Sequence, residues 1–169
     1  MQGFDVDLRR NSPDAPTYFQ KGAVDGEFVQ VDQIEWQPMP EPFAHGGIFW
    51  KLLHVSPELG SWTAYYKCPV GSYFSAHIHI GPGEYLLTKG KMEVRGGVEL
   101  GGETAYGLGY GYEPSSARHD KTFFPVDSEF YMSFIGPLHW INEEDGSTIA
   151  VTGWKELQDV WLQQTGSSQ

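Results

Sequence analysis

Short apolar runs separated by turn residues recur along most of the chain. The clearest runs are GIFWKLLHV, WTAYYKC, YFSAHIHI, EYLLTKGKMEVR and EFYMSFIG, and the turns between them include SPELGS, PVGS and GPG. In EFYMSFIG, alternation places Phe130, Met132 and Phe134 on one face of a strand. Turn signals at intervals of roughly 10 to 15 residues are typical of a β-sandwich or barrel. The pattern therefore predicts an all-β fold.

One segment near the C-terminus departs from this strand rhythm. In GWKELQDVWLQQTG, apolar residues recur with the period of a helix and form one stripe. The stripe consists of Trp154, Leu157, Val160 and Trp161. Gly166 follows and is a residue suited to ending a helix. We predict one short C-terminal helix that caps the barrel.

The N-terminal part of the chain has a different character. Residues 1–27 are polar and interrupted by proline and glycine, which predicts an extension or arm. The apolar rhythm begins at FVQVDQIEW, so we expect residues 28–165 to form a single barrel domain that includes the helix. Residues 166–169 are then a short tail.

Charge and cysteine content narrow the classes of partner. The 169 residues include 11 basic and 22 acidic side chains, a formal net charge of −11. Nucleic acid and anionic membrane surfaces both require a basic face, so neither is expected as a partner.

No apolar stretch approaches the ~20 residues of a membrane helix. Cys68 is the only cysteine, so no internal disulfide is possible, and no signal peptide is recognisable in residues 1–30. We expect a cytoplasmic protein.

Two histidines in the run YFSAHIHI are the first candidates for chemistry. Strand alternation places His77 and His79 on the same face, about 6.5–7 Å apart along the strand. Two such imidazoles can share a metal ion if a third ligand arrives from a neighbouring strand, although core histidines remain the alternative. The segment YGYEPSSARHD supplies a third candidate, His119, after a proline turn.

These residues resemble the two motifs of the cupin superfamily. The resemblance rests on Gly71, His77, His79, Gly90 and the segment EPSSARH, which ends in His119, although Ser116 stands where the second motif usually has glycine. Longer stretches between about residues 28 and 161 resemble the cupin branch that contains 2,4'-dihydroxyacetophenone dioxygenase-like and acetylacetone-cleaving proteins. The resemblance implies a double-stranded β-helix, or jelly-roll barrel, that binds a divalent metal.

The ligand set that this resemblance implies is His77, His79 and His119, which would act in catalysis through the bound metal. The metal expected for this branch is Fe(II), with Zn, Mn or Ni as alternatives. The usual motif also has a glutamate seven residues before the strand glycine, but here Glu84 lies six before Gly90.

A shift of one residue turns a strand side chain to the opposite face, so Glu84 points away from the metal unless the GPG loop absorbs the shift. Glu99, expected on the following strand, is the other possible carboxylate. Each is retained as a possible fourth ligand or as a partner of a ligand.

Three neutral imidazoles leave the charge of a divalent ion uncompensated, which suits an anionic, chelating substrate. Together with this site, the resemblance to the branch implies a dioxygenase that uses O₂ to cleave a C–C bond in a small ketone, either an aryl hydroxyketone or a β-diketone. The alternatives are an O₂-independent isomerase, lyase or hydrolase, and a non-enzymatic sensory cupin. The resemblance also implies a homodimer or higher homo-oligomer. Candidate residues of the substrate pocket are Tyr65, Phe74, Tyr85, Tyr112 and Phe134.

Overall fold

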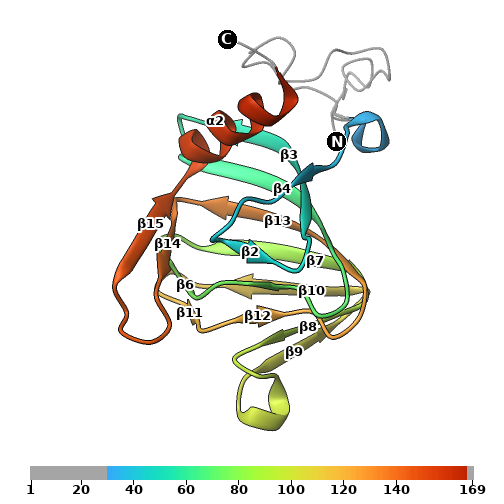
Figure 1. Ribbon diagram of the computed structural model, residues 1–169, viewed down its shortest axis with the longest axis vertical. Coiled ribbons are helices and arrows are strands. Elements are labelled where there is room, and N and C mark those ends of the chain that lie inside the picture. The colour runs from blue at the N-terminus through green and yellow to red at the C-terminus, as the bar shows by residue number, and fades with distance from the viewer. Residues whose placement is uncertain (1–29, 167–169) are drawn as a thin grey trace, which may run out of the picture. The chain divides into compact units, whose positions relative to one another are not determined.

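The computed structural model describes residues 30–166 (Figure 1). The chain divides into two compact units, Met1–Glu35 and Trp36–Gln169. The described part of the first unit contains one 3₁₀ turn, η2 (Val31–Gln33). The arm predicted for residues 1–27 and the last three residues of the predicted tail lie outside the described residues.

The second unit is built from three antiparallel sheets. The largest has the strand order β1 (Gln37–Pro38), β3 (Phe49–Ser56), β4 (Ser61–Cys68), β13 (Ser128–Ile135), β7 (Gly83–Lys89) and β10 (Gly109–Glu113). The four-stranded sheet has the order β11 (Arg118–His119), β6 (His77–His79), β14 (Leu138–Ile141) and β15 (Thr148–Thr152). The five-stranded sheet has the order β2 (Ala44–His45), β5 (Tyr73–Phe74), β12 (Thr122–Phe123), β8 (Lys91–Val94) and β9 (Glu103–Tyr106), with the 3₁₀ turn η3 (Val98–Leu100) between β8 and β9.

Alternation along the central strands of the large sheet creates its buried face. On β13, Phe130, Met132 and Phe134 are buried, as the sequence pattern predicts. Their partners across the strand pair complete two aromatic stacks. Phe134 lies opposite Trp62 with ring centroids 4.7 Å apart, and Phe130 lies opposite Tyr66 at 4.9 Å. Offset-stacked aromatic pairs of this kind add to the stabilisation that burial gives.

The smaller sheets cover this aromatic face. Phe74 of β5 makes edge contacts with Tyr66 and Phe130, at centroid distances of 5.3 Å and 6.1 Å. His79 of β6 contacts Phe134 at 4.9 Å. The core therefore lies between the large sheet and the two smaller ones, and the histidines face it.

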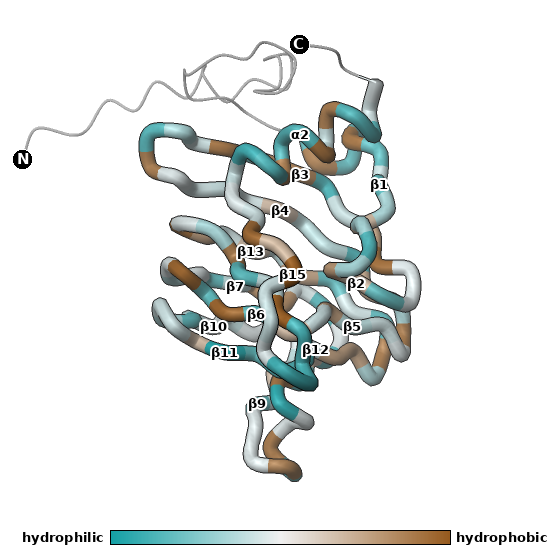
Figure 2. The backbone as a smooth tube through the Cα atoms, turned by 60° about the vertical axis from the view of Figure 1, so that its left-hand side comes forward, coloured by the Kyte–Doolittle hydropathy of each residue, from teal (hydrophilic) through white to brown (hydrophobic). Residues whose placement is uncertain are grey.

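The helix α2 (Trp154–Thr165) packs beside β3, as Figure 1 shows. The Gly153 amide at its start donates a hydrogen bond to the Glu156 carboxylate (2.8 Å), and the helix ends at Gly166, whose φ of 69° lies in the left-handed region. Hydrophobic and hydrophilic positions alternate along it (Figure 2). Leu157 and Trp161 are its buried residues. In the described part of the chain, no helix combines the length and the apolar character of a membrane span.

Candidate metal centre

Three buried histidines converge on one face of the four-stranded sheet. His119 lies directly opposite His77 in the β11–β6 pair, and His79 lies two residues further along β6. One nitrogen from each ring lies within 4.8 Å of the corresponding atoms of the other two. The strand pairing thus brings together residues that are about forty positions apart in the sequence.

Hydrogen bonds hold two of these rings in place. The Nδ1 of His77 lies 2.8 Å from the Ser75 carbonyl oxygen and donates to it, which leaves Nε2 as the lone-pair nitrogen. The Nδ1 of His119 lies 3.4 Å from the Thr122 hydroxyl, which is also buried. Both partners fix the ring orientation, and the carbonyl oxygen also fixes the His77 tautomer that a metal ligand requires.

The third histidine is fully buried and has no hydrogen-bond partner on either ring nitrogen. An unpaired polar atom in the protein interior is costly, so such an atom marks a place where a further group binds. Together with three neutral nitrogen donors in a compact set, the unpaired His79 nitrogens fit a divalent metal ion. The chain therefore carries a three-histidine metal site.

Burial keeps all three imidazoles neutral. Loss of solvation lowers the pKa of His77 to about 4, that of His79 to about 3 and that of His119 to about 2. Only the neutral imidazole can donate a lone pair to a metal, so the rings are ready to bind one at neutral pH without first losing protons.

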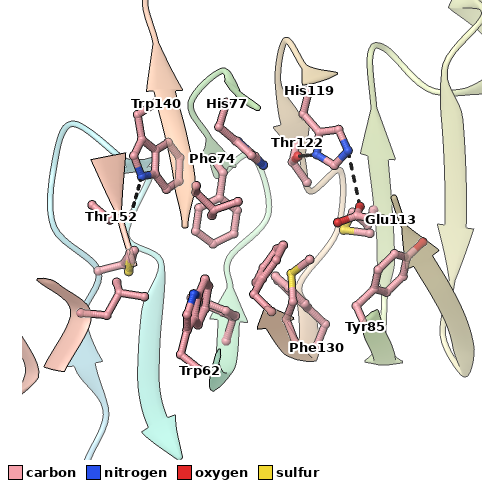
Figure 3. A pocket seen from close by; sticks show the side chains of 17 residues that line it. Trp62, Phe74, His77, Tyr85, Glu113, His119, Thr122, Phe130, Trp140 and Thr152 are labelled. Atoms are coloured by element: carbon pink, nitrogen blue, oxygen red, sulfur yellow. Dashed lines mark hydrogen bonds and ion pairs between the residues drawn. The ribbon is translucent and has the colours of Figure 1, made fainter. Parts of the chain in front are cut away.

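A buried carboxylate that the sequence analysis missed stands beside the histidines. Glu113 ends β10, and its two oxygens lie 3.6 Å from His79 Nδ1 and 3.5 Å from His119 Nε2. Figure 3 shows the contact with His119. Burial raises the pKa of Glu113 from its ordinary 4.5 to about 8, and the nearby charge of Glu103 adds to the effect. The sequence does contain a signal for it. Alternation along GYGYE puts Glu113 on the inner face with Gly109 and Gly111.

The structure brings neither predicted carboxylate to the histidines. Glu84 is exposed on the outer face of β7, as its register suggests. The residue in the ligand register is Gly83, where an added Cβ would lie 2.5 Å from the Phe134 ring. Phe134 therefore fills the space of the usual glutamate. Glu99 is exposed on η3, a 3₁₀ turn and not the strand that we expected.

A substitution at Gly83 tests whether this contact with Phe134 is tight. We expect Gly83→Ala to destabilise the protein by about 1–3 kcal/mol, because the new methyl group overlaps a buried ring. Gly60→Ala is a matched control for the loss of a glycine, since nothing lies within 4 Å of that position, although its φ of 64° adds strain of its own. Denaturant unfolding curves measure both changes. Equal stability of Gly83→Ala and the parent would contradict the packing described here.

Three of the five predicted pocket residues line the cavity, and two do not. Phe74, Tyr85 and Phe134 line the cavity in front of the histidines. Tyr65 does not, because it lies on the outer face of β4, where its hydroxyl donates to Glu129 at 2.8 Å. Tyr112 is 58% exposed, since alternation turns it away from its neighbour Glu113.

Comparison with known proteins agrees with the fold and with the histidine motif. A family model described as the ChrR cupin-like domain matches residues 24–139. The chain belongs to this cupin family. An acetylacetone-cleaving enzyme of Acinetobacter johnsonii is 56% identical over 145 residues, which are 86% of this cupin and 94% of that enzyme. The predicted all-β cupin fold with a C-terminal helix is thus confirmed.

Solved structures agree with this assignment. An acetylacetone dioxygenase from Acinetobacter johnsonii has a TM-score of 0.80 and 56% identity over 84% of this cupin and 95% of that chain. A candidate acetylacetone dioxygenase of Methylibium petroleiphilum PM1 has a TM-score of 0.79 and 62% identity over 82% of this cupin and 96% of that chain. An RmlC-like cupin of Ralstonia eutropha JMP134, with 21% identity over 87% of this cupin and 88% of that chain and a TM-score of 0.70, shares the fold alone.

Proposed function

We propose that this cupin is a dioxygenase that binds Fe(II) and uses O₂ to cleave a C–C bond in a small chelating ketone. The observation that carries the proposal is the buried set of three neutral imidazoles, which leaves the metal charge to be balanced by an anionic substrate. The identity of 56% with an acetylacetone-cleaving enzyme supports a β-diketone as the substrate. An aryl hydroxyketone is the other substrate that the site chemistry suits.

The protein's own residues would prepare the substrate. His77, His79 and His119 would hold the iron, which when bound supplies Lewis acidity toward the ketone oxygens and the redox chemistry that O₂ activation needs. Phe74, with other aromatic side chains of the cavity, excludes water from the reacting groups.

Glu113 is placed to act as the base that removes the acidic proton of the ketone. Burial favours its protonated form, whereas a bound cation favours the carboxylate. Because these two effects oppose each other, a Glu113 oxygen can accept the proton that a chelating ketone loses when it becomes an enolate. The negative charge of the enolate would then replace that of the carboxylate beside the cation. A pKa close to the working pH is suited to such a transfer.

Oxygen uptake by iron-loaded protein tests the function. We expect a β-diketone such as acetylacetone to consume one O₂ per molecule cleaved, and zinc-loaded protein to consume none. Absence of oxygen uptake with a panel of β-diketones and aryl hydroxyketones would contradict the proposal. Turnover under anaerobic conditions would favour an isomerase, lyase or hydrolase. A metal with no open coordination position would favour a sensory cupin.

We further propose that the protein works in the cytoplasm as a homodimer or larger homo-oligomer. Exposed apolar side chains support the second point. Tyr110, Leu86 and Tyr131 form a cross-strand row on the outer face of the large sheet, and each is at least 38% exposed. Light scattering on the purified protein measures the oligomeric state directly.

A further inference from the structure

The cavity in front of the histidines continues across both sheets, away from the metal site. At one end lie Glu113 on β10 and His119 on β11, each on an outermost strand of its sheet. At the other end lie Trp62 on β4, three strands from β10, and Trp140 on β14. With strands ~4.8 Å apart, Trp62 and Glu113 are separated by about 14 Å along the large sheet, whereas Trp140 lies beside His77, with ring centroids 4.9 Å apart. Figure 3 shows Trp140 and Glu113 on opposite sides of the cavity.

The end away from the metal, which we call the distal compartment, has an apolar lining. It consists of Met39, Trp62, Leu138, Trp140, Thr152 and Leu157. Its polar atoms already have partners. The Trp140 indole N–H donates to the Thr152 hydroxyl (2.8 Å), and the Trp62 N–H donates to the Gly136 carbonyl oxygen (3.2 Å). No charged side chain lines this compartment, so a ligand there would be bound mainly by apolar contacts.

The metal end contrasts with this lining. His77, His119 and Glu113 face the same cavity there, and the half-buried Tyr85 lies beside Glu113, where the absence of a side chain at Gly111 leaves room for its ring. The cavity is thus polar at one end and apolar at the other. A ligand that matches it has a polar, metal-chelating head and an apolar tail.

We propose that the distal compartment is a binding subsite for a short apolar arm of the ketone substrate, with Leu157 as the stop that limits the length of the arm. This proposal rests on the proposed function. The preferred substrates are then unsymmetrical ketones that carry a small alkyl group directed toward α2. The volume of the whole cavity, metal end included, is about 40 Å³, room for about three water-sized groups, so only a short alkyl arm fits beside the chelating head.

Leu157 can act as a stop because α2 is anchored at both ends. The Gln164 side chain accepts a hydrogen bond from the Trp50 indole (3.1 Å) and donates one to the Pro38 carbonyl oxygen (2.7 Å). At its start, α2 follows β15 after the single residue Gly153, so the strand holds that end of the helix. With its backbone fixed in this way, the helix holds the Leu157 side chain in one position against the cavity.

A series of β-diketones with alkyl arms of one to six carbons tests the subsite. Each methylene that the compartment accommodates should raise kcat/KM about fourfold, and one that meets Leu157 should lower it. Leu157→Ala removes three carbon atoms, so we expect the preferred arm to lengthen by about three carbons. Leu157→Phe should shorten it. Leu53→Ala is the matched control, because Leu53 is buried on β3 but does not line the cavity.

An unchanged chain-length preference in Leu157→Ala would overturn the subsite, provided that the shortest diketone is still cleaved. If that variant fails to fold, Leu157→Val removes a single carbon and should shift the preference by about one. Failure of every diketone, in the parent as well, would overturn the proposed function instead. Binding is then followed in the metal-free protein by thermal shift with simple alkyl ketones. A preference there that lengthens in Leu157→Ala supports the subsite, and one that does not overturns it.

Discussion

Loss of any one histidine of the triad is expected to abolish stoichiometric metal binding. His77→Ala, His79→Ala and His119→Ala each remove one of three nitrogen donors, and two remaining imidazoles in a cavity hold a divalent ion far less tightly. Dioxygenase activity should fall to background with the metal. Elemental analysis of protein purified with iron, and O₂ uptake by the same samples, measure both effects.

Two controls separate ligand loss from damage to the fold. His139→Ala changes a histidine whose Nε2 contacts the Thr148 hydroxyl at 2.8 Å on the outer face of the same sheet, and it should keep its metal. Glu84→Gln should also bind metal normally, since Glu84 is exposed on the outer face of β7. Full metal content in the three triad variants would show that the ion binds elsewhere.

The metal-free protein should tolerate the loss of His79 better than most buried changes. Each histidine is buried without charge, and both ring nitrogens of His79 lack hydrogen-bond partners. Removing an unsatisfied polar group relieves a desolvation cost, which offsets part of the cost of the new cavity. His79 is therefore positioned for binding and contributes little to stability by itself, whereas His77 and His119 also make hydrogen bonds to Ser75 and Thr122.

The histidines could be located from sequence because their geometry is local and periodic. Two histidines separated by one residue in a strand must share a face, and the proline turn before His119 returns the chain to a neighbouring strand. The same alternation of side chains along β7 places Glu84 on the outer face of the sheet and Gly83 on the inner face. No local pattern predicts that the Phe134 ring occupies the space beside Gly83, because Phe134 lies on a strand fifty residues away in the sequence.

Glu113 shows why the rest of the site was harder to predict. It lies next to Pro114 in the motif segment, but the usual position of the family glutamate points toward Glu84 instead. Alternation applied to β10 would have placed Glu113 inside and Tyr112 outside. The distances from Glu113 to His119 and His79 depend on how the turn after β10 carries the chain from the large sheet to β11, and on the pairing of β11 with β6.

Glu113→Gln is expected to have opposite effects on the metal-free and the metal-bound protein. In the metal-free protein, the pKa of Glu113 is about 8, whereas the unfolded chain titrates near 4.5. Between these values the folded state holds a proton that the unfolded state has lost, so stability falls as the pH rises through this window. The penalty at pH 7 is on the order of 3 kcal/mol. A neutral glutamine avoids it, and the variant should be more stable than the parent without metal.

Between pH 6.5 and 8, the effect of Glu113 on stability can be measured apart from that of the three histidines. The pKa values of the three histidines are lowered in the fold, so their contributions change only below about pH 6.5, where stability falls with falling pH. Above that pH, the metal-free parent should lose stability with a slope of up to about 1.4 kcal/mol per pH unit. Glu113→Gln should be flat in comparison. Denaturant unfolding in the presence of a chelator gives both curves.

With iron bound, the sign reverses. The cation favours the carboxylate, so replacement by glutamine should weaken metal binding about 10- to 100-fold. Loss of the base should lower kcat by a further factor of about 10² to 10⁴ in iron-saturated protein. Glu113→Asp keeps the charge on a shorter side chain and should recover part of the activity. A glutamine variant that matches the parent in stability, affinity and rate would mean that Glu113 does not act on the metal site, and the anionic substrate alone would then balance the charge that three neutral histidines leave open.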